Sequence, residues 1–332
     1  MGRKAYFLAA LLTLTACGGR GGTGTVIGLS IPTQREERWV RDVQQLRRDA
    51  AARGLELKLQ VSDNDAARQL AQCENLLAGG IDVLILAPHD ATAASVIVEK
   101  AHRLGVPVIS YDRLVSNADV DLYVSFDNMK VGELQGRYLT GKVPKGDYIV
   151  LSGAPTDNNA KLFRQGALSV IGPLAAKGDI RVIMDQPVRD WQPAEAMRLV
   201  ENALTAAQNR VDAVLAPNDG TAGGAIQALA AQGLAGKVPV TGQDAELSAA
   251  RRVLDGTQSM TVFKDTRRLA SSAIEAAEAM AQKLPPTYNA ELTNGPYKVK
   301  VAMIGAQVVD RANLDEVLIN SGYLSRTDIY GE

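Results

Sequence analysis

Short apolar segments rich in Val, Ile and Leu alternate with amphipathic stretches along most of this chain. The first of these segments span residues 26–31, 55–61, 83–87, 106–110 and 122–126. Helical patterns over residues 37–53 and 66–78, and one that runs through Ala101 and Leu104, lie between them. Strands that are apolar on both faces are typical of a parallel sheet with helices on each side. The pattern therefore predicts an α/β fold with a doubly wound domain.

The same alternation starts again near Tyr148. Apolar segments at 148–151, 180–184, 211–215 and 238–241 are separated by helical stretches at 160–177, 193–208 and 221–232. A length of 332 residues is enough for two domains of ordinary size. We therefore expect a second doubly wound, Rossmann-like domain.

The last part of the chain does not fit into that second sheet. An apolar segment at 259–263 is followed by a helical stretch at 266–283, a Pro285-Pro286 break, an apolar segment at 299–304 and a polar tail. We expect the chain to return to the first domain and to cross between the domains more than once. Multiple crossings form a hinge.

The N-terminus is typical of an export signal. Arg3-Lys4 precedes an apolar run from Ala5 to Leu14, which is too short to span a bilayer, and Leu14-Thr15-Ala16-Cys17 follows. This ending resembles the lipobox of bacterial lipoproteins, which implies a signal peptide over residues 1–16 and a lipid on Cys17. Residues 17–25 then form a Gly-rich tether. An ordinary secretory signal with an incidental Cys17 is the alternative.

The charge balance and the few Cys and His residues argue against nucleic-acid binding, metal binding and catalysis. Lys and Arg number 36 and Asp and Glu number 37, so there is no basic excess for nucleic acid, and we expect membrane contact through the lipid only. Cys73 lies on the apolar stripe of its helix and is expected to be a core thiol. His89 and His102 are too few for a metal cluster or a catalytic triad. We expect no catalytic residue, no metal and no cofactor.

Polar or aromatic side chains follow almost every predicted strand. In an α/β sheet, ligands bind beyond the carboxyl ends of the strands, so these side chains are candidates for one cleft between the domains. A helix cap or a salt bridge could explain any one of them taken alone. Asp190 and Asp219 also follow predicted strands beside this set. The ten selected candidates are Arg38, Trp39, Asp112, Arg113, Asp157, Asn159, Trp191, Asn218, Asp244 and Lys264.

Two properties of this set point to a neutral sugar. The only two tryptophans of the chain are in it, one from each domain, and two indoles suit a flat ligand with apolar faces. Core packing is the alternative for Trp39. The three cations are balanced by three aspartates, which suits a ligand whose hydroxyl groups both donate and accept hydrogen bonds.

Several motifs resemble those of the periplasmic sugar-binding proteins of the ribose- and galactose-binding type, and most closely the D-xylose-binding members that serve ABC transporters. The similarity runs from about Val26 to Val262 and includes 37–39, 111–113, 125–128, 157–164, 222–229, 242–244 and 256–264. It implies a type I periplasmic binding protein fold, with two Rossmann-like domains joined by a three-crossing hinge. The implied domains are 26–128 plus 263–302 and 129–262 plus 303–332.

The resemblance also implies a function and a set of contacts. The family's sugar contacts fall on the ten candidates above, with Trp39 and Trp191 as the stacking pair. We expect a monomeric, extracytoplasmic lipoprotein that passes a monosaccharide, D-xylose in the first place, to the permease subunits of an ABC importer. The loop from Pro32 to Glu36 does not match the family pattern, so sugar selectivity is the least determined property.

Other functions remain as alternatives. The ligand could be another neutral aldose such as glucose or ribose, or the protein could present sugar to a chemosensor. A repressor of the lactose-repressor type would need a DNA-reading headpiece, and here an export signal precedes the first domain. An enzyme could use Lys264 as a Schiff-base amine or Asp112 with Asp244 as an acid-base pair, but the nearby carboxylates would keep the amine charged.

Overall fold

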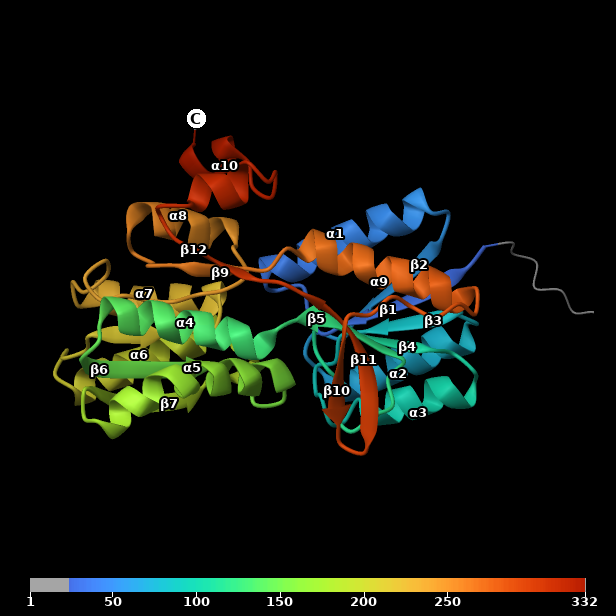
Figure 1. Cartoon of the computed structure of the whole chain (residues 1–332), viewed down its shortest axis with the longest axis horizontal. Helices are drawn as coiled ribbons and strands as arrows, with labels where there is room; N and C mark the ends of the chain where they lie inside the picture. Colours follow the sequence, from blue (N-terminus) through green and yellow to red (C-terminus); the bar gives the residue numbers. More distant parts are fainter. Residues whose placement is uncertain (1–23, 332) are drawn as a thin grey trace, which may run out of the picture.

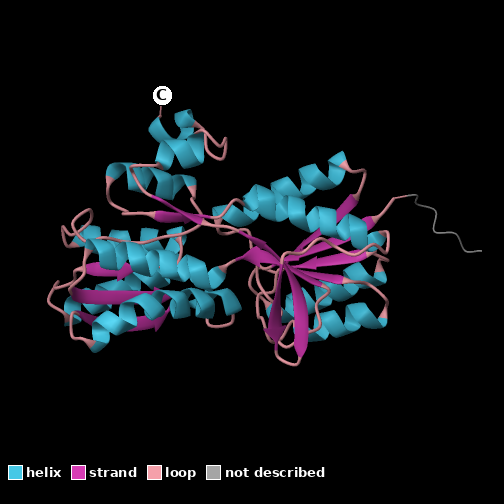
Figure 2. Ribbon diagram, in the orientation of Figure 1, coloured by secondary structure: helices cyan, strands magenta, loops and turns pink. Residues whose placement is uncertain are grey.

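The chain forms two α/β lobes that lie next to each other, each with helices packed around a sheet (Figures 1 and 2). The computed structural model describes residues 24–331. The predicted signal peptide, Cys17 and most of the tether lie outside the described residues.

The first lobe contains a seven-stranded sheet with the order β10-β11-β5-β4-β3-β1-β2. Every neighbouring pair is parallel except β10 and β11 at the edge. The strands are β1 (Val26–Ile31), β2 (Glu56–Val61), β3 (Val83–Leu86), β4 (Val108–Tyr111), β5 (Leu122–Phe126), β10 (Ala290–Asn294) and β11 (Tyr297–Ile304). The return of β11 to this sheet confirms that the chain comes back to the first domain.

Helices cover both faces of this sheet, as the apolar strands predict. Its helices are α1 (Glu37–Ala52), α2 (Ala66–Ala78), α3 (Ser95–Arg103) and α9 (Thr266–Ala281). In β3, Val83 and Ile85 pack with α1 and α9, whereas the alternating Leu84 and Leu86 pack with α2 and α3. The thiol of Cys73 is buried among the second group, so the expected core role of this residue is confirmed.

The second lobe is built around β6 (Gly146–Ser152), which pairs in parallel with β7 (Ile180–Pro187) and β8 (Ala213–Leu215). One face packs against α5 (Asn158–Ala176) and α4 (Asn128–Lys142), and the other against α6 (Pro193–Ala206) and α7 (Asp219–Ala231). Beyond β8 the sheet becomes irregular.

The segment 238–241, which the sequence predicts as a strand, is joined to the sheet only by a single bridge between Val214 and Val240. Pro239 has no N–H group to donate, which limits a regular ladder here. A second bridge, between Gln243 and Val262, leads on to β9 (Thr261–Phe263), and β9 pairs antiparallel with β12 (Gln307–Val309).

The C-terminal tail is not simply polar, so that expectation is wrong. After β12 it forms a π-helical turn (Asp315–Ile319) and α10 (Arg326–Tyr330). Its apolar side chains Leu318 and Ile329 are buried against α8 (Leu247–Asp255), a short helix that the sequence analysis did not include. Widely spaced apolar residues in a polar segment gave no clear period to detect.

The chain passes between the lobes three times, as expected. The crossings lie between β5 and α4, between β9 and α9, and between β11 and β12 (Figure 1). None of the helices within residues 24–331 is long and apolar enough to cross a membrane.

Helix α4 was absent from the predicted elements because glycines interrupt its pattern, and the structure explains them. A Cβ atom at Gly132 would lie 2.0 Å from the carbonyl oxygen of Phe163, and one at Gly166 would lie 2.1 Å from that of Met129. The backbones of α4 and α5 therefore touch, which only residues without a side chain allow. This contact fixes the helix that carries Asn159.

We predict that Gly166→Ala destabilises the protein by about 1 to 3 kcal/mol, because the methyl group forces the two backbones apart. The matched control is Gly172→Ala on the same helix, where an added Cβ meets nothing within 4 Å. That change should be neutral or slightly stabilising, because alanine favours the helix. Urea unfolding followed by circular dichroism measures both, and equal stabilities of the two variants would contradict the close packing.

Candidate functional site

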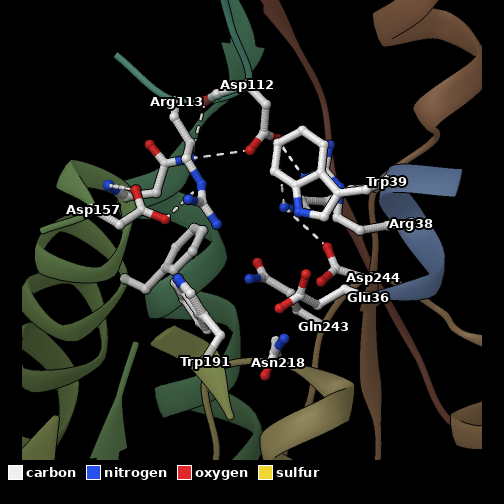
Figure 3. A pocket seen from close by; sticks show the side chains of 13 residues that line it. Glu36, Arg38, Trp39, Asp112, Arg113, Asp157, Trp191, Asn218, Gln243 and Asp244 are labelled. Carbon is white, nitrogen blue, oxygen red and sulfur yellow. Dashed lines mark hydrogen bonds and ion pairs between the residues drawn. The ribbon is translucent and has the colours of Figure 1, made fainter. Parts of the chain in front are cut away.

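A small pocket lies between the two lobes, beyond the carboxyl ends of their strands (Figure 3). All ten candidates from the sequence line it. Three further residues, which the sequence analysis did not select, complete the lining: Glu36, Phe163 and Gln243. Phe163 and Gln243 belong to motifs that carry the family resemblance, and Glu36 is two residues before Arg38. Their closeness in the sequence to selected residues is the signal that could have found them.

Two residues of the first lobe enter the pocket from the start of α1. Arg38 and Trp39 lie in the first turn of this helix, directly after β1 and its loop. Trp39 is 1% exposed and belongs to the apolar core of the first lobe. The guanidinium carbon of Arg38 lies 4.4 Å from the centre of the indole, and that of Arg113 lies 5.3 Å from it. Trp39 is thus both a core residue and the apolar support for two arginines.

Asp112 and Arg113 follow β4, where the backbone turns sharply. Asp112 has a φ of 59°, in the left-handed region that few residues other than glycine adopt. Its carbonyl oxygen accepts hydrogen bonds from the hydroxyl groups of Tyr123 and Ser125 and from the amide of Asn159, at 2.9, 2.7 and 3.0 Å. These three bonds hold the turn and direct the Asp112 carboxylate to Arg38.

Two residues of the second lobe each have a side chain that both caps a helix and lines the pocket. Asp157 caps α5 with Oδ1, which accepts a hydrogen bond from the backbone N–H of Asn159 at 2.9 Å. Its Oδ2 faces Nε of Arg113 at 2.8 Å. Asn218 caps α7 through Oδ1, which accepts from the N–H of Thr221 at 3.0 Å. Capping and a place in the site are therefore not alternatives for these residues.

Trp191 and Asp244 reach the pocket from strained backbone. Trp191 ends a 3-10 turn (Arg189–Trp191) with a φ of 57°, and Asp244 has a φ of 97°. Such conformations cost on the order of 1 to 3 kcal/mol each and persist only where the surroundings impose them. The Trp191 indole lies against Gly153, where a Cβ atom would be 2.1 Å from the ring, and it meets Phe163 edge to face at 6.4 Å.

The cations and aspartates of the pocket pair one to one. Arg38 meets Asp112 at 2.6 Å, Arg113 meets Asp157 at 2.8 Å, and Lys264 meets Asp244 at 3.0 Å. Arg38 also donates to Asp42 behind the pocket, at 2.7 Å. The three cations and three aspartates that the sequence suggested thus form three buried ion pairs, and Glu36 adds a fourth carboxylate to the lining of the pocket.

Burial and charge act in opposite directions on these carboxyl groups. Burial tends to raise the pKa of Asp112, but the positive charges of Arg38 and Lys264 outweigh it and hold this pKa below its usual value. Burial raises the pKa of Asp157, and Arg113 offsets only part of this effect. In Asp42, burial raises the pKa to about 6. The pKa is thus lowered for Asp112 but raised for Asp157 and for Asp42.

Four buried polar atoms of the pocket make no hydrogen bond among the described residues. They are Oε2 of Glu36, Nε1 of Trp191, Oε1 of Gln243 and Oδ1 of Asp244, the last of which has only its ion pair with Lys264. A buried polar group without a partner costs about 1 to 3 kcal/mol. The pocket therefore offers one donor and two acceptors to a polar ligand, in addition to its ion pairs. Within residues 24–331, no group of three or more His, Cys, Asp or Glu side chains is arranged to hold a metal ion.

Direct contacts between the lobes close the pocket. Besides the Arg113 and Asp157 pair, the backbone N–H of Ala91 donates to the carbonyl oxygen of Thr156 at 2.9 Å. At the opposite side, Oε2 of Glu37 accepts from the N–H of Leu247 at 3.0 Å, which supplies a cap to α8 from the other lobe. The structure is thus a closed arrangement of the two lobes.

The chain is similar to known periplasmic sugar-binding proteins. Residues 27–285 match the periplasmic binding protein domain. The chain is 45% identical to the D-xylose-binding periplasmic protein of Haemophilus influenzae, with 92% of each chain covered. It is 41% identical to the protein of the same name from Escherichia coli, over 91% of this chain and 92% of that one.

Solved structures agree with this relationship. A carbohydrate transporter solute-binding protein from Chloroflexus aurantiacus, in complex with D-glucose, superposes with a TM-score of 0.87 at 36% identity. The match covers 92% of this chain and 98% of that protein. With the motifs, the two-lobed fold and these relatives in agreement, the chain belongs to the periplasmic binding protein family and has its type I fold.

Proposed function

We propose that this protein captures a neutral monosaccharide, D-xylose in the first place, in the pocket between its lobes and delivers it to an ABC importer. The observation that carries the proposal is the pocket itself. Its three cations are already paired with three aspartates, whereas Nε1 of Trp191, Oε1 of Gln243 and Oε2 of the Glu36 carboxyl group have no hydrogen-bond partner among the described residues. Burial raises the pKa of Glu36, which favours a ligand that supplies hydrogen bonds over one that brings a compensating charge.

A pyranose has these properties. Its hydroxyl groups each donate and accept, and its ring presents apolar C–H faces to an aromatic wall. We assign the polar contacts to Arg38, Asp112, Arg113, Asp157, Asn159, Asn218, Asp244 and Lys264, and the aromatic contacts to Trp39 and Trp191. The D-xylose-binding names of two relatives with more than 40% identity support xylose over other sugars.

Glucose is the second candidate ligand, because the similar structure from Chloroflexus aurantiacus contains it. Xylose and glucose share the same equatorial hydroxyl groups and differ by one hydroxymethyl group, so the same polar residues could satisfy either sugar. Selectivity then depends on whether the space beyond ring C5 is filled. Presentation of the sugar to a chemosensor is compatible with the same pocket.

Catalysis is the less suitable role for this site. Lys264 lies 3.0 Å from Asp244 and 3.9 Å from Asp112, in an arrangement that suits an ammonium group donating hydrogen bonds. A Schiff-base lysine must be neutral to attack a carbonyl group. The relatives described above are named for binding and transport.

Calorimetric titration of the purified protein against D-xylose, D-glucose, D-ribose, L-arabinose and D-galactose tests the proposal. We expect saturable one-to-one binding of D-xylose, with D-glucose weaker or similar and the other three sugars weaker still. The protein should return labelled xylose unchanged after long incubation. Failure of every sugar to bind would reject the proposed function.

Trp191 should provide affinity that xylose and glucose share. The side chain offers a ring face and one unpartnered N–H, so we expect Trp191→Ala to weaken both sugars by similar factors of about tenfold or more. Trp191→Phe keeps one six-membered aromatic ring and removes the N–H together with the five-membered ring, so its loss of affinity should be smaller than that of Trp191→Ala. Titration of both variants measures this. A loss of glucose binding alone in Trp191→Ala would instead make the indole the selector.

We also propose that a lipid on Cys17 is the membrane attachment and that residues 17–25 tether a monomeric binding protein on the extracytoplasmic side. Cys17→Ser should then release a sugar-binding protein into the soluble fraction after cell disruption. Detection by immunoblot, with Cys73→Ser as the matched control that stays in the membrane fraction, measures this. A Cys17→Ser protein that still resists a salt wash would contradict the anchor.

A further inference from the structure

Glu36 occupies the N-cap position of α1 but does not act as a cap. Its backbone is extended, with φ −76° and ψ 136°, and its side chain makes no hydrogen bond to the first turn. The carboxylate instead lines the pocket, next to Arg38 and Trp39 in the sequence (Figure 3). An N-terminal position without a capping role leaves this side chain available to a ligand.

Glu36 is the one carboxylate lining the pocket that has no ion pair among residues 24–331. Asp112, Asp157 and Asp244 use Arg38, Arg113 and Lys264, respectively. Oε2 of Glu36 is buried and accepts no hydrogen bond from the described part of the protein. Burial raises the pKa of this carboxyl group, and the positive charges of Arg113 and Arg35 offset that effect only in part. A partner for Oε2 must therefore come from within the pocket.

The surroundings of Glu36 define the chemistry of that partner. Figure 3 shows Glu36, Gln243 and Asp244 on one side of the pocket, with Asp157 and Arg113 on the other. Oε1 of Gln243 is a second buried acceptor on this side without a partner among the described residues. On the other side, Asp112, Asn159, Arg113 and Asp157 already satisfy one another. The side with Glu36 is therefore where a ligand must donate.

We propose that Glu36 determines sugar specificity by accepting, through Oε2, a hydrogen bond from one hydroxyl group of the bound monosaccharide. This inference rests on the proposed function and extends it. A hydroxyl group bound to a carboxylate is more favourable than a neutral pair, and a sugar without that hydroxyl leaves a buried carboxylate alone. Sites of this kind reject the analogue that lacks the group much more strongly than an apolar pocket could.

The test compares Glu36→Gln and Glu36→Leu with the unmodified protein by titration against D-xylose. Leucine has a similar shape and no acceptor, so Glu36→Leu should weaken binding about 10- to 100-fold. Glutamine retains a carbonyl acceptor and should stay within a few-fold of the unmodified protein. The control is Gln34→Leu, an exposed position on the same loop, which should leave the affinity unchanged. Equal thermal unfolding of all variants shows that they fold.

Deoxy sugars identify the hydroxyl group. The 2-deoxy, 3-deoxy and 4-deoxy analogues of xylose should each bind the unmodified protein more weakly. For one of them the effect of Glu36→Leu should disappear, which a residue with a purely structural role would not produce. If Glu36→Leu instead weakens every analogue by the same factor, or binds xylose as well as the unmodified protein does, the assignment is wrong.

An amino sugar distinguishes an ammonium donor from a hydroxyl donor at Glu36. If the natural donor were an ammonium group, 2-amino-2-deoxy-D-glucose should bind more tightly than D-glucose, and Glu36→Gln should abolish this preference. That outcome would overturn the hydroxyl assignment. The proposed function is tested separately, because a protein that binds none of the sugars fails before any Glu36 variant is compared.

Discussion

The ion pair between Arg113 and Asp157 is the interaction on which the closed arrangement most depends. It joins the loop after β4 in the first lobe to the N-terminus of α5 in the second, at 2.8 Å and with both side chains buried. Removing one partner of such a pair strands a buried charge and costs about 3 to 5 kcal/mol. Because the other oxygen of Asp157 caps α5, the same carboxylate stabilises a helix and the contact between the lobes.

The rest of the pocket is arranged around this contact. The turn at Asp112 is held by Tyr123, Ser125 and Asn159, so one carbonyl oxygen ties the two lobes together a second time. Trp39 anchors the start of α1 in the core and supports Arg38, which in turn pairs with Asp112. Each charged group is therefore positioned by packing before any ligand contacts it. Preorganisation of this kind lowers the entropy that binding would otherwise cost.

Local backbone strain in the pocket is found at Asp112 of the first lobe and at two residues of the second. Trp191 and Asp244 both adopt left-handed conformations, and Gly153 leaves space for the indole. Strain at these positions is compensated by the surrounding core, since Trp191 packs with Phe163, Met260 and Val262. These conformations fit a pocket that must present a flat ring and a carboxylate at defined places.

The sequence by itself determined the fold class, the return of the chain to the first sheet, and the ten side chains that meet in the pocket. Period and apolar content suffice for the fold class, because strands buried on both faces admit few other architectures. The ten side chains were selected by their places after predicted strands and by the resemblance to the sugar-binding family. Only the tertiary structure decided which charges pair, that Asp157 and Asn218 both cap helices and line the pocket, and that Glu36 lines it without an ion-pair partner among residues 24–331. It also revealed α4, whose glycines look unfavourable for a helix until α5 is packed against them. These features depend on distances between residues far apart in the chain, which no local pattern encodes.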